Sequence, residues 1–446
     1  MYFRQIYIFI IAISLFITGC QKLVNDPGNS TIDEMKSDEG LNYWGGAYDD
    51  FGNAVVQTAD GGYAVVGSQF NATNNEDLYI VKFDSELNIT SEKVHAGSAT
   101  STETTNAYLT YNSKANDLQQ TRDGGYISVG STFNGTDLDV WVVKFTSDLT
   151  AAPSWETVIT GVANSDDWGE SIQQMASGEY LICGTSYDAT TGNDYDVVLW
   201  KVSGTGTYTA ATDLLYTETV ALNNGTHDYG NYAEQTSDGG YIIVGTSASG
   251  ITLTKLSSAT PPALVTSFGE SADGEGDGGI ITIPEGDEGT YVQQMDDDGY
   301  IVVGNTEAGT GQQSDVYINT VSSTGVVTSP HTTIGGAYND KITCIRQTSD
   351  GGFVFTGSSY DYASEEDVWI VKLTPALSTQ WSVTYGGYKK DEGRSIYQTT
   401  DGGYIITGST VSYNYDDNQS EIVLLKLKND GTVDNIIGKL TAFAGN

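Results

Sequence analysis

Three segments of the chain combine tyrosines with carboxylates or amides, a mixture that suits binding to sugars or to polar protein surfaces. They are residues 187–196 (YDATTGNDYD), 360–367 (YDYASEED) and 413–418 (YNYDDN). A tyrosine ring offers a flat apolar face with a polar tip, and a nearby carboxylate can accept sugar hydroxyls. Solvated loops are the alternative. The expected ligand-binding residues are Tyr187, Asp188, Asp194, Tyr195, Tyr360, Asp361, Tyr362, Glu365, Tyr413, Tyr415, Asp416 and Asp417.

An acidic segment at residues 271–279 (SADGEGDGG) has the spacing of a calcium-binding loop. Asp273, Glu275 and Asp277 alternate as the oxygen ligands of Ca²⁺ do, and Gly278 permits a sharp turn. Glu275 is an unusual residue for the third position of such a loop, and Pro284 occupies the position of the closing bidentate acid. Ca²⁺ is the one cofactor that the sequence indicates, and a flexible acidic loop between the fourth and fifth repeats is the alternative.

Few side chains suit a transition-metal site or catalysis. The histidines are His95, His227 and His331, and none has a second histidine or a cysteine at metal-ligand spacing, which argues against a zinc site. Acids are so abundant that no particular carboxylate pair can be assigned to glycoside hydrolysis. The residue types therefore favour a binding protein, and a glycan-active hydrolase remains the alternative.

The element that must position these residues is a repeat. The phrase Gln-Thr-x-Asp-Gly-Gly-Tyr, exact or degenerate, occurs seven times, and its last residues are separated by 51 to 63 positions. Each copy contains a short apolar run, a turn that is Asp-Gly-Gly in five copies, a second apolar run, a polar loop and a third run, which ends in lysine except in the fifth copy, where Thr320 takes its place. This spacing predicts four short strands with a hairpin between the first two.

The third strands, such as LYIVK and VWIVK, are apolar on both faces, which fits a sheet packed between two other sheets. We therefore predict an all-β fold, a seven-bladed β-propeller of four-stranded antiparallel blades over residues 41–446. Two segments fit the fourth strand of the last blade, residues 41–46 and 432–437, and both can pair there.

Features that recur in most blades are expected to serve the blade itself. The hairpin aspartates should accept backbone N–H groups in their turns, and the lysines that end the third strands should pair with acids of the same or the adjoining blade. These aspartates are Asp60, Asp123, Asp238, Asp298, Asp350 and Asp401. Acidic pairs that open several blades, such as Asp391-Glu392, predict either turns or a ring of carboxylates at the channel mouth.

In a four-stranded meander, the loops between strands two and three lie at the same end as the loops between blades. That end collects the long loops with the tyrosines, so we expect ligand binding there. Of the arginines beyond residue 20, Arg122 falls in a hairpin turn at the other end, while Arg346 and Arg394 fall in first strands. We therefore do not expect the three arginines to bind a ligand carboxylate together.

The repeats resemble the tandem QTSDGGY-type blades of secreted Bacteroidetes lipoproteins, over roughly residues 41–437. Their Thr-x-Asp-Gly-Gly-Tyr core is also similar to the Asp-box hairpin of sialidase-type propellers, although Tyr or Phe replaces the usual tryptophan. Because such hairpins occur in unrelated propellers, the resemblance implies a fold and leaves the activity open.

The chain begins with a secretory signal. Residues 6–16 form a short apolar run after Arg4, and Ile17-Thr18-Gly19-Cys20 resembles the lipobox of bacterial lipoproteins. That resemblance implies cleavage after residue 19 and acylation of Cys20, and Gln21 implies the outer membrane as destination. Residues 20–40 are polar and read as a disordered tether. We expect a lipoprotein of the cell envelope, periplasmic or surface-facing, held to the membrane by its lipid alone.

The net charge of −39 excludes nucleic acid as a partner, because phosphate backbones would be repelled. The expected partner is an envelope protein or a glycan, and we expect a monomer. Cys183 and Cys344 lie in apolar runs of different repeats and are predicted to be buried thiols.

Overall fold

The computed structural model describes residues 41–44, 48–71, 75–96, 113–149, 153–161, 165–188, 194–217, 227–269, 278–306, 313–328, 330–360, 365–387, 389–412 and 419–434. They belong to one compact unit, Gly40–Asn446. Cys20, the signal and the tether lie outside the described residues, as do Asp273, Glu275 and Asp277. Within the described ranges, no helix has the length and apolar character that a membrane crossing requires.

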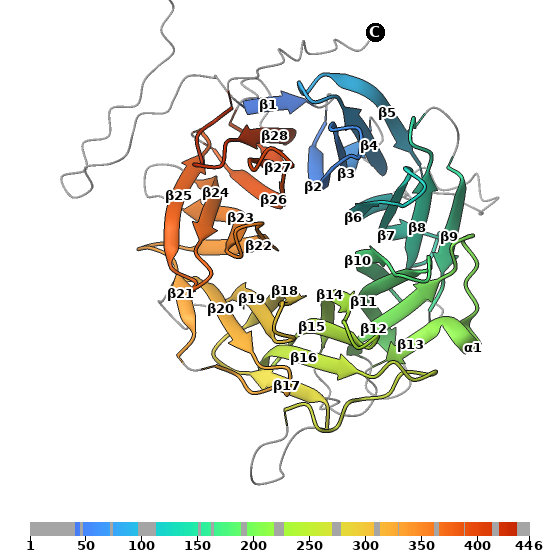
Figure 1. Cartoon of the computed structure of the whole chain (residues 1–446). Coiled ribbons are helices and arrows are strands. Elements are labelled where there is room, and N and C mark those ends of the chain that lie inside the picture. Colours follow the sequence, from blue (N-terminus) through green and yellow to red (C-terminus); the bar gives the residue numbers. More distant parts are fainter. Residues whose placement is uncertain are drawn as a thin grey trace, which may run out of the picture. The chain divides into compact units, whose positions relative to one another are not determined.

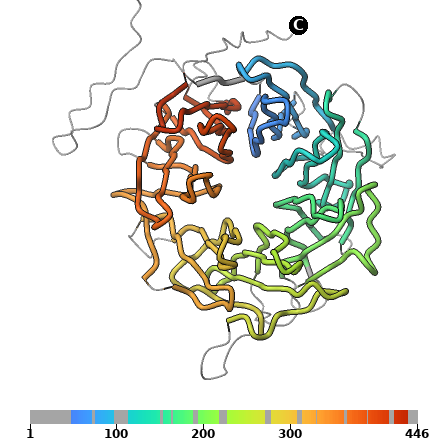
Figure 2. Tube along the Cα trace, in the orientation of Figure 1, coloured from blue at the N-terminus to red at the C-terminus, as the bar shows by residue number. Residues whose placement is uncertain are grey.

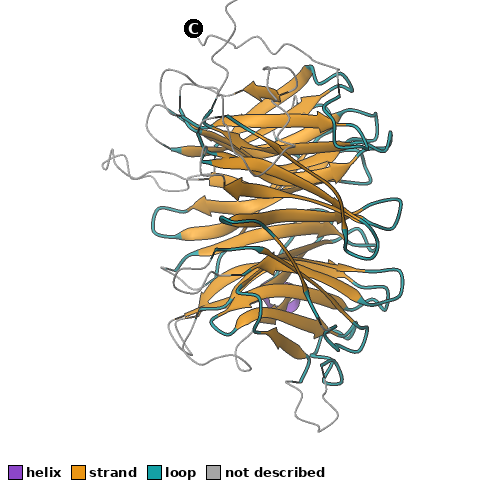
Figure 3. Cartoon of the chain, turned by 90° about the vertical axis from the view of Figure 1, so that its left-hand side faces the viewer, coloured by secondary structure: helices purple, strands orange, loops and turns teal. Residues whose placement is uncertain are grey.

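Seven four-stranded antiparallel sheets surround a central channel, and the fold is a seven-bladed β-propeller, as the repeats predict (Figure 1). In the colour sequence of Figure 2 the first and last blades are neighbours. Seen from the side, the strands cross the ring from one face to the other and the loops gather at both faces (Figure 3). The single helix of the described part is the short α1 (Ala210–Asp213).

Blades 1 to 7 are numbered in chain order by their innermost strands, which are β2 (Asp50–Gln57), β6 (Ser113–Gln120), β10 (Asp167–Gln174), β14 (Tyr229–Gln235), β18 (Glu288–Gln294), β22 (Asp340–Gln347) and β26 (Asp391–Gln398). The second strands are β3 (Tyr63–Phe70), β7 (Tyr126–Phe133), β11 (Tyr180–Asp188), β15 (Tyr241–Ser247), β19 (Tyr300–Asn305), β23 (Phe353–Tyr360) and β27 (Tyr404–Thr410).

The third strands are β4 (Glu76–Phe83), β8 (Leu138–Phe145), β12 (Asp194–Val202), β16 (Gly250–Leu256), β20 (Val316–Val321), β24 (Glu366–Leu373) and β28 (Glu421–Leu427). The outermost strands of blades 1 to 6 are β5 (Ile89–His95), β9 (Trp155–Ile159), β13 (Leu214–Thr217), β17 (Ile280–Ile283), β21 (Thr332–Ile334) and β25 (Thr379–Tyr385).

The core lies between neighbouring blades. Every residue of β28 is buried, and β8 is buried at every position except Leu138, which confirms that the third strands are covered on both faces. In one cluster, Val66 and Ile80 of blade 1 pack with Trp141 and Val143 of blade 2. Because each sheet buries its apolar faces only against other sheets, the ring is stable as a whole.

The repeated aspartates and lysines stabilise the hairpin turns, as expected. In blade 6 the Asp350 carboxylate accepts hydrogen bonds from the Gly352 backbone N–H at 3.0 Å and from the Lys372 ammonium at 3.0 Å. The same lysine–aspartate ion pair occurs in blades 1, 2, 4 and 7. Blade 3 uses Glu179 with Lys201 instead.

Blade 5 corrects one expectation about these turns. The residue that accepts the turn N–H, from Gly299, is Asp297. Asp298 occupies the position of the first glycine, with a positive φ of 64°. The phrase Met295-Asp-Asp-Asp-Gly-Tyr thus replaces that glycine, and an aspartate tolerates the left-handed conformation better than most residues do.

The repeated glutamine links five of the blades to the preceding one. The Gln120 amide oxygen of blade 2 accepts a hydrogen bond from the Ala59 backbone N–H of blade 1 at 2.8 Å. The same bond joins Gln57 of blade 1 to the Thr400 N–H of blade 7, also at 2.8 Å. This bond therefore also spans the junction where the two ends of the chain meet.

Both terminal segments complete blade 7, which decides the open question of closure. Strand β1 (Leu41–Trp44) is the fourth strand and pairs antiparallel with β28, with Leu41 opposite Leu425 and Trp44 opposite Ile422. Val433 adds an isolated bridge to Leu427. The N-terminal segment supplies the strand, and the described part of the C-terminal segment adds this bridge and the hydrogen bond from the Asp434 backbone N–H to the Lys426 carbonyl at 3.0 Å.

The acidic segment at 271–279 is placed differently from the expectation. Blade 4 contains β16, which ends at Leu256, and β17, which begins at Ile280. The segment therefore precedes the fourth strand of blade 4 and does not separate blades 4 and 5. The connection between strands three and four belongs to the same face as the Asp-Gly-Gly turns, opposite the long loops.

Candidate functional site

The channel wall is built by a β-bulge that recurs in every innermost strand. At each bulge the pairing with the second strand shifts by one residue, so two consecutive side chains line the channel. Together these strands enclose a cavity of about 380 Å³. The first residues of the seven pairs are Asn53, Asn116, Glu170, Asn231, Thr290, Thr343 and Arg394.

A glycine in the second strand makes room for each bulge. A Cβ at Gly408 would collide with the carbonyl oxygen of Glu392, and a Cβ at Gly67 would collide with that of Phe51. The repeated Gly-Ser or Gly-Thr that ends the second apolar run therefore marks the bulge in the sequence. The glycines position the residues of the channel wall.

Most bulge residues bond to the next blade. The Asn53 amide donates to the Ala115 carbonyl at 2.7 Å, the Asn116 amide to Gly169 at 2.9 Å, and the Thr343 hydroxyl to Gly393 at 2.6 Å. Glu170 departs from this pattern, since an ionised carboxylate has no proton to donate to the neighbouring carbonyl. A feature found in one blade only is a candidate for function, and Glu170 is that residue in the ring.

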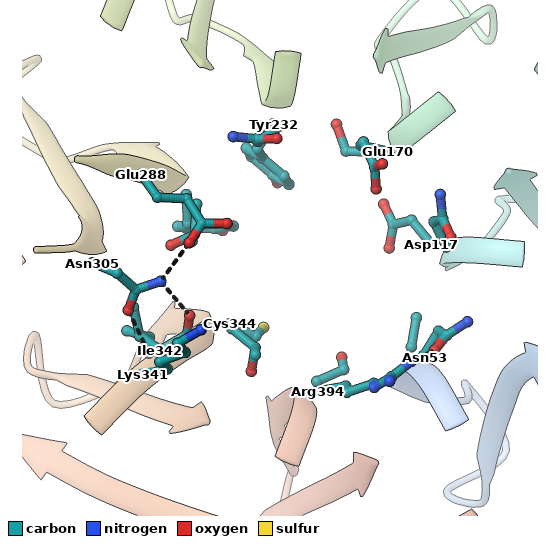
Figure 4. Close-up of a pocket in the computed structure, with 18 of the residues that line it drawn as sticks. Asn53, Asp117, Glu170, Tyr232, Glu288, Asn305, Lys341, Ile342, Cys344 and Arg394 are labelled. Carbon is teal, nitrogen blue, oxygen red and sulfur yellow. Dashed lines mark hydrogen bonds between the residues drawn. The ribbon is translucent and has the colours of Figure 1, made fainter. Parts of the chain in front are cut away.

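Glu170 lies beside a second carboxyl group. Figure 4 shows Glu170 and Asp117 pointing toward one another from blades 3 and 2. Burial raises the pKa of Glu170 to about 7, and the charge of Asp117 adds to this rise, against the lowering effects of Lys114 and of a hydrogen bond from Trp168. Burial also raises the pKa of Asp117, although the Ile172 backbone N–H donates to it at 2.9 Å. The pair can therefore hold a proton near neutral pH.

Cationic side chains lie in blades 6 and 7. The Arg346 guanidinium stacks over the Tyr291 ring at 4.8 Å, and that of Arg394 stacks over Phe51 at 4.9 Å. Arg394 also donates to Asn53 at 2.6 Å, which joins blade 7 to blade 1. Lys341 lines the same cavity. The channel is thus acidic at blades 2 and 3 and basic at blades 6 and 7.

A second cavity of about 650 Å³ overlaps the first and involves blades 3 to 6. Both are lined by Glu170, Asn231, Glu288, Asn305 and Lys341. The Asn305 amide donates to Glu288 and to the Ile342 carbonyl, each at 3.3 Å, as the dashed lines in Figure 4 show. These fixed amides and carboxylates offer both donors and acceptors to a polar ligand.

Five aromatic rings gather beside this second cavity, and we call them the aromatic cluster: Trp168, Tyr187, Tyr195, His227 and Tyr229. Tyr195 is central, with ring centroids 5.1 Å from Trp168, 5.3 Å from Tyr187, 5.1 Å from His227 and 6.0 Å from Tyr229. Trp168 and Tyr229 line the cavity itself. The cluster therefore extends from the long loops to the channel wall.

The structure brings together some of the residues expected from the sequence. Tyr187 and Tyr195 meet in the aromatic cluster, because they stand opposite each other in the antiparallel pairing of β11 with β12. Asp194 does not belong to an exposed loop, since it begins β12 and is 2% exposed. Tyr360 is 40% exposed and packs on Tyr338 at 5.7 Å, away from the residues that line either cavity.

Other expected positions can be placed only partly. Glu365 is exposed at the start of β24. Asp361, Tyr362, Tyr413, Tyr415, Asp416 and Asp417 lie outside the described residues, as does the side chain of Asp188. The three arginines do not converge, as expected, because Arg122 donates to the Met175 carbonyl at 2.8 Å in the turn of the next blade. Cys183 and Cys344 are free, buried thiols.

The paired acids that open the blades form neither turns nor a complete ring at the channel mouth. One acid is buried in three of these pairs: Asp50 and Asp167 are the second members of theirs, and Asp391 is the first member of its pair. In blades 5 and 7 the second acid, Glu288 or Glu392, lines the cavity. No group of three or more His, Cys, Asp or Glu side chains that could hold a metal occurs among the described residues.

Comparisons with known proteins assign this chain to no family. No family model and no curated protein matches the chain. Similar solved structures include a protein of unknown function from Dyadobacter fermentans, with 9% identity, coverage of 88% of this chain and 99% of that one, and a TM-score of 0.47. A fungal alcohol oxidase in complex with copper has 12% identity, coverages of 88% and 78%, and a TM-score of 0.47. Chaetomium thermophilum Sqt1 has 13% identity, coverages of 84% and 83%, and a TM-score of 0.44. Similarities at this level carry no argument about function.

Proposed function

We propose that this propeller binds a glycan at the long-loop mouth of its channel. The observation that carries the proposal is the aromatic cluster beside a cleft lined by amides and carboxylates. Sugar rings pack their apolar faces on aromatic rings, while their hydroxyls need donors and acceptors at fixed positions. Trp168 and Tyr229 supply the first requirement, and Asn231, Asn305 and Glu288 supply the second.

The proposal is tested by screening the full chain on a glycan array and measuring affinity for the best ligand by calorimetry. Tyr195→Ala and Trp168→Ala should each weaken binding by about tenfold or more, because aromatic anchors dominate such contacts. Tyr360→Ala is the matched control, since this tyrosine lies on the same face but lines neither cavity. Equal affinity of all three variants and the wild type would refute the assignment.

A second candidate function is glycoside hydrolysis, and one observation favours it. Glu170, with a pKa near 7, can act as a general acid at neutral pH, and Asp117 is the carboxylate beside it. The assay is the release of reducing ends from whichever glycan binds. Glu170→Gln should abolish release and preserve binding if the site is catalytic, whereas binding without release in the wild type leaves a binding protein.

The proposed setting of this activity is the cell envelope. We infer from the lipobox-like segment that Cys20 carries the acyl chains and holds a monomeric propeller on the outer membrane, in contact with a glycan or protein of the envelope. Cys20→Ser should move the protein from the detergent phase to the aqueous phase in a partitioning experiment. If the substitution leaves the partitioning unchanged, Cys20 does not carry the lipid anchor.

A further inference from the structure

Two aspartates are buried against each other where blades 3 and 4 meet. Asp194 begins β12, the third strand of blade 3, and Asp228 immediately precedes β14, the first strand of blade 4. Each is only 2% exposed. Burial and, to a smaller extent, the charge of Asp194 together raise the pKa of Asp228 to about 7, so the two carboxyl groups interact.

Within the part of the chain that the structure describes, neither oxygen of Asp194 accepts a hydrogen bond, and Oδ1 of Asp228 accepts none either. Asp228 in this respect differs from the aspartates at the same position of other blades. In three other blades, the aspartate that begins the first strand accepts a bond from a glycine backbone N–H. These bonds are Gly161 to Asp167 at 3.0 Å, Gly336 to Asp340 at 2.6 Å, and Gly387 to Asp391 at 2.8 Å.

Leaving several carboxylate oxygens buried without a partner costs a large free energy, so something must neutralise them. A proton shared between the two side chains would engage one oxygen of each and leave the second oxygen of Asp194 unpaired. A divalent cation can contact both oxygens of Asp194 and one of Asp228 and cancel both charges. We propose that Asp194 and Asp228 bind a divalent cation between blades 3 and 4.

The best fit among hard divalent cations is Ca²⁺. It accepts bidentate carboxylates and irregular oxygen ligation, whereas Mg²⁺ demands octahedral geometry and keeps several waters. Retained waters do not suit oxygens that are buried as deeply as these three are. The site differs from the acidic segment at 271–279, and it does not depend on the glycan proposal.

The cation would also order the aromatic cluster, because the two aspartates adjoin it in the chain. Asp194 precedes Tyr195, and Asp228 lies between His227 and Tyr229. The Asp228 backbone N–H donates to the Tyr195 carbonyl at 2.8 Å, and the Tyr195 N–H contacts His227 Nδ1 at 3.1 Å. A cation on the two carboxylates would fix these two chain segments relative to each other.

The test uses the full chain and two probes. Tb³⁺ is excited through nearby tyrosine and tryptophan rings, so its luminescence reports binding next to the aromatic cluster, and Ca²⁺ should displace it. Thermal unfolding should occur at a higher temperature in Ca²⁺ than in EDTA. Asp228→Asn should weaken Tb³⁺ binding by more than about tenfold and remove the Ca²⁺ effect on Tm.

The Asp228→Asn variant should fold, because asparagine removes the repulsion that burdens the metal-free pair, and its Tm in EDTA at pH 8 should exceed that of the wild type. Asp296→Asn changes the same charge at an exposed turn on the other face and should bind Tb³⁺ as the wild type does. A third variant, Asp273→Asn with Glu275→Gln and Asp277→Asn, should also retain binding.

Three results would overturn the proposal. One is a wild-type Tm that is the same in Ca²⁺ and in EDTA. Another is a Tm that falls as the pH rises through 7 with no Ca²⁺ effect, which indicates a shared proton. The last is Tb³⁺ binding lost in the triple variant and kept in Asp228→Asn, which assigns the cation to residues 271–279.

Discussion

Glu170 should destabilise the propeller at neutral and alkaline pH, and Glu170→Gln measures by how much. Its pKa rises from an ordinary 4.5 to about 7 on folding, so the folded state holds the proton more tightly than the unfolded state does. The cost is absent below about pH 4.5, grows between pH 4.5 and 7, and is complete above pH 7. At 1.36 kcal/mol per pH unit, the difference of about 2.5 corresponds to at most about 3.4 kcal/mol.

Water in the channel reduces that figure, because the Glu170 side chain is only half-buried at the cavity wall. We expect Glu170→Gln to stabilise the protein by about 1 to 2 kcal/mol at pH 8 and to change little at pH 4. Urea unfolding at both pH values gives the free energies. Glu392→Gln is the control, since Glu392 lies 3.5 Å from Arg394 and should gain no stability when neutralised. A Glu170→Gln variant that is destabilised at pH 8, or equally affected at both pH values, refutes the reasoning.

Three further predictions concern contacts that stabilise the blades. Five turn aspartates have pKa values held near 2, so the stability they contribute should be complete above about pH 4 and be lost as the pH falls through about 2. Asp350→Asn should cost about 1 to 2 kcal/mol at pH 7, because Lys372 loses its charged partner, and much less at pH 2, as paired urea titrations would show. Gly408→Ala should lower stability by more than about 2 kcal/mol, because its methyl group meets the Glu392 carbonyl, and a loss under about 0.5 kcal/mol would contradict this. Deleting Leu41–Trp44 should lower Tm and expose β28 to proteolysis, and an unchanged digestion pattern would show that the strand is dispensable.

The fold could be predicted from the sequence because its rules repeat. Seven copies of one phrase fixed the number of blades, and third strands such as VWVVK showed burial on both faces. The partners of the repeated lysines also followed, since Lys144 and Asp123 recur at corresponding positions. The turn in blade 5 was misassigned because three consecutive aspartates offered more than one alignment, and backbone conformation decides between them.

The candidate site was predictable only in part. The tyrosines of blade 3 were conspicuous, but Trp168 and Tyr229 come from innermost strands and meet the loop only in the folded ring. The sequence did contain a signal for Glu170, because the corresponding residue of the first strand is Asn or Thr in five of the seven repeats. The burial of Asp194 could not have been foreseen, since the strand extends into what the sequence presents as loop.

Strand β1 has a consequence for the order of assembly. It is the first strand of the propeller to be synthesised, yet its only hydrogen-bonded neighbour is β28, which is made last. Strand β1 can therefore pair only after nearly the whole polypeptide has been synthesised, and the sheet of blade 7 contains residues from both ends of the chain. Such pairing has the greatest sequence separation that this chain offers, and contacts of that kind form slowly. The ring should consequently close late, and until then an incomplete chain leaves β1 unpaired and exposes the apolar face of blade 1 that packs on blade 7 in the complete ring.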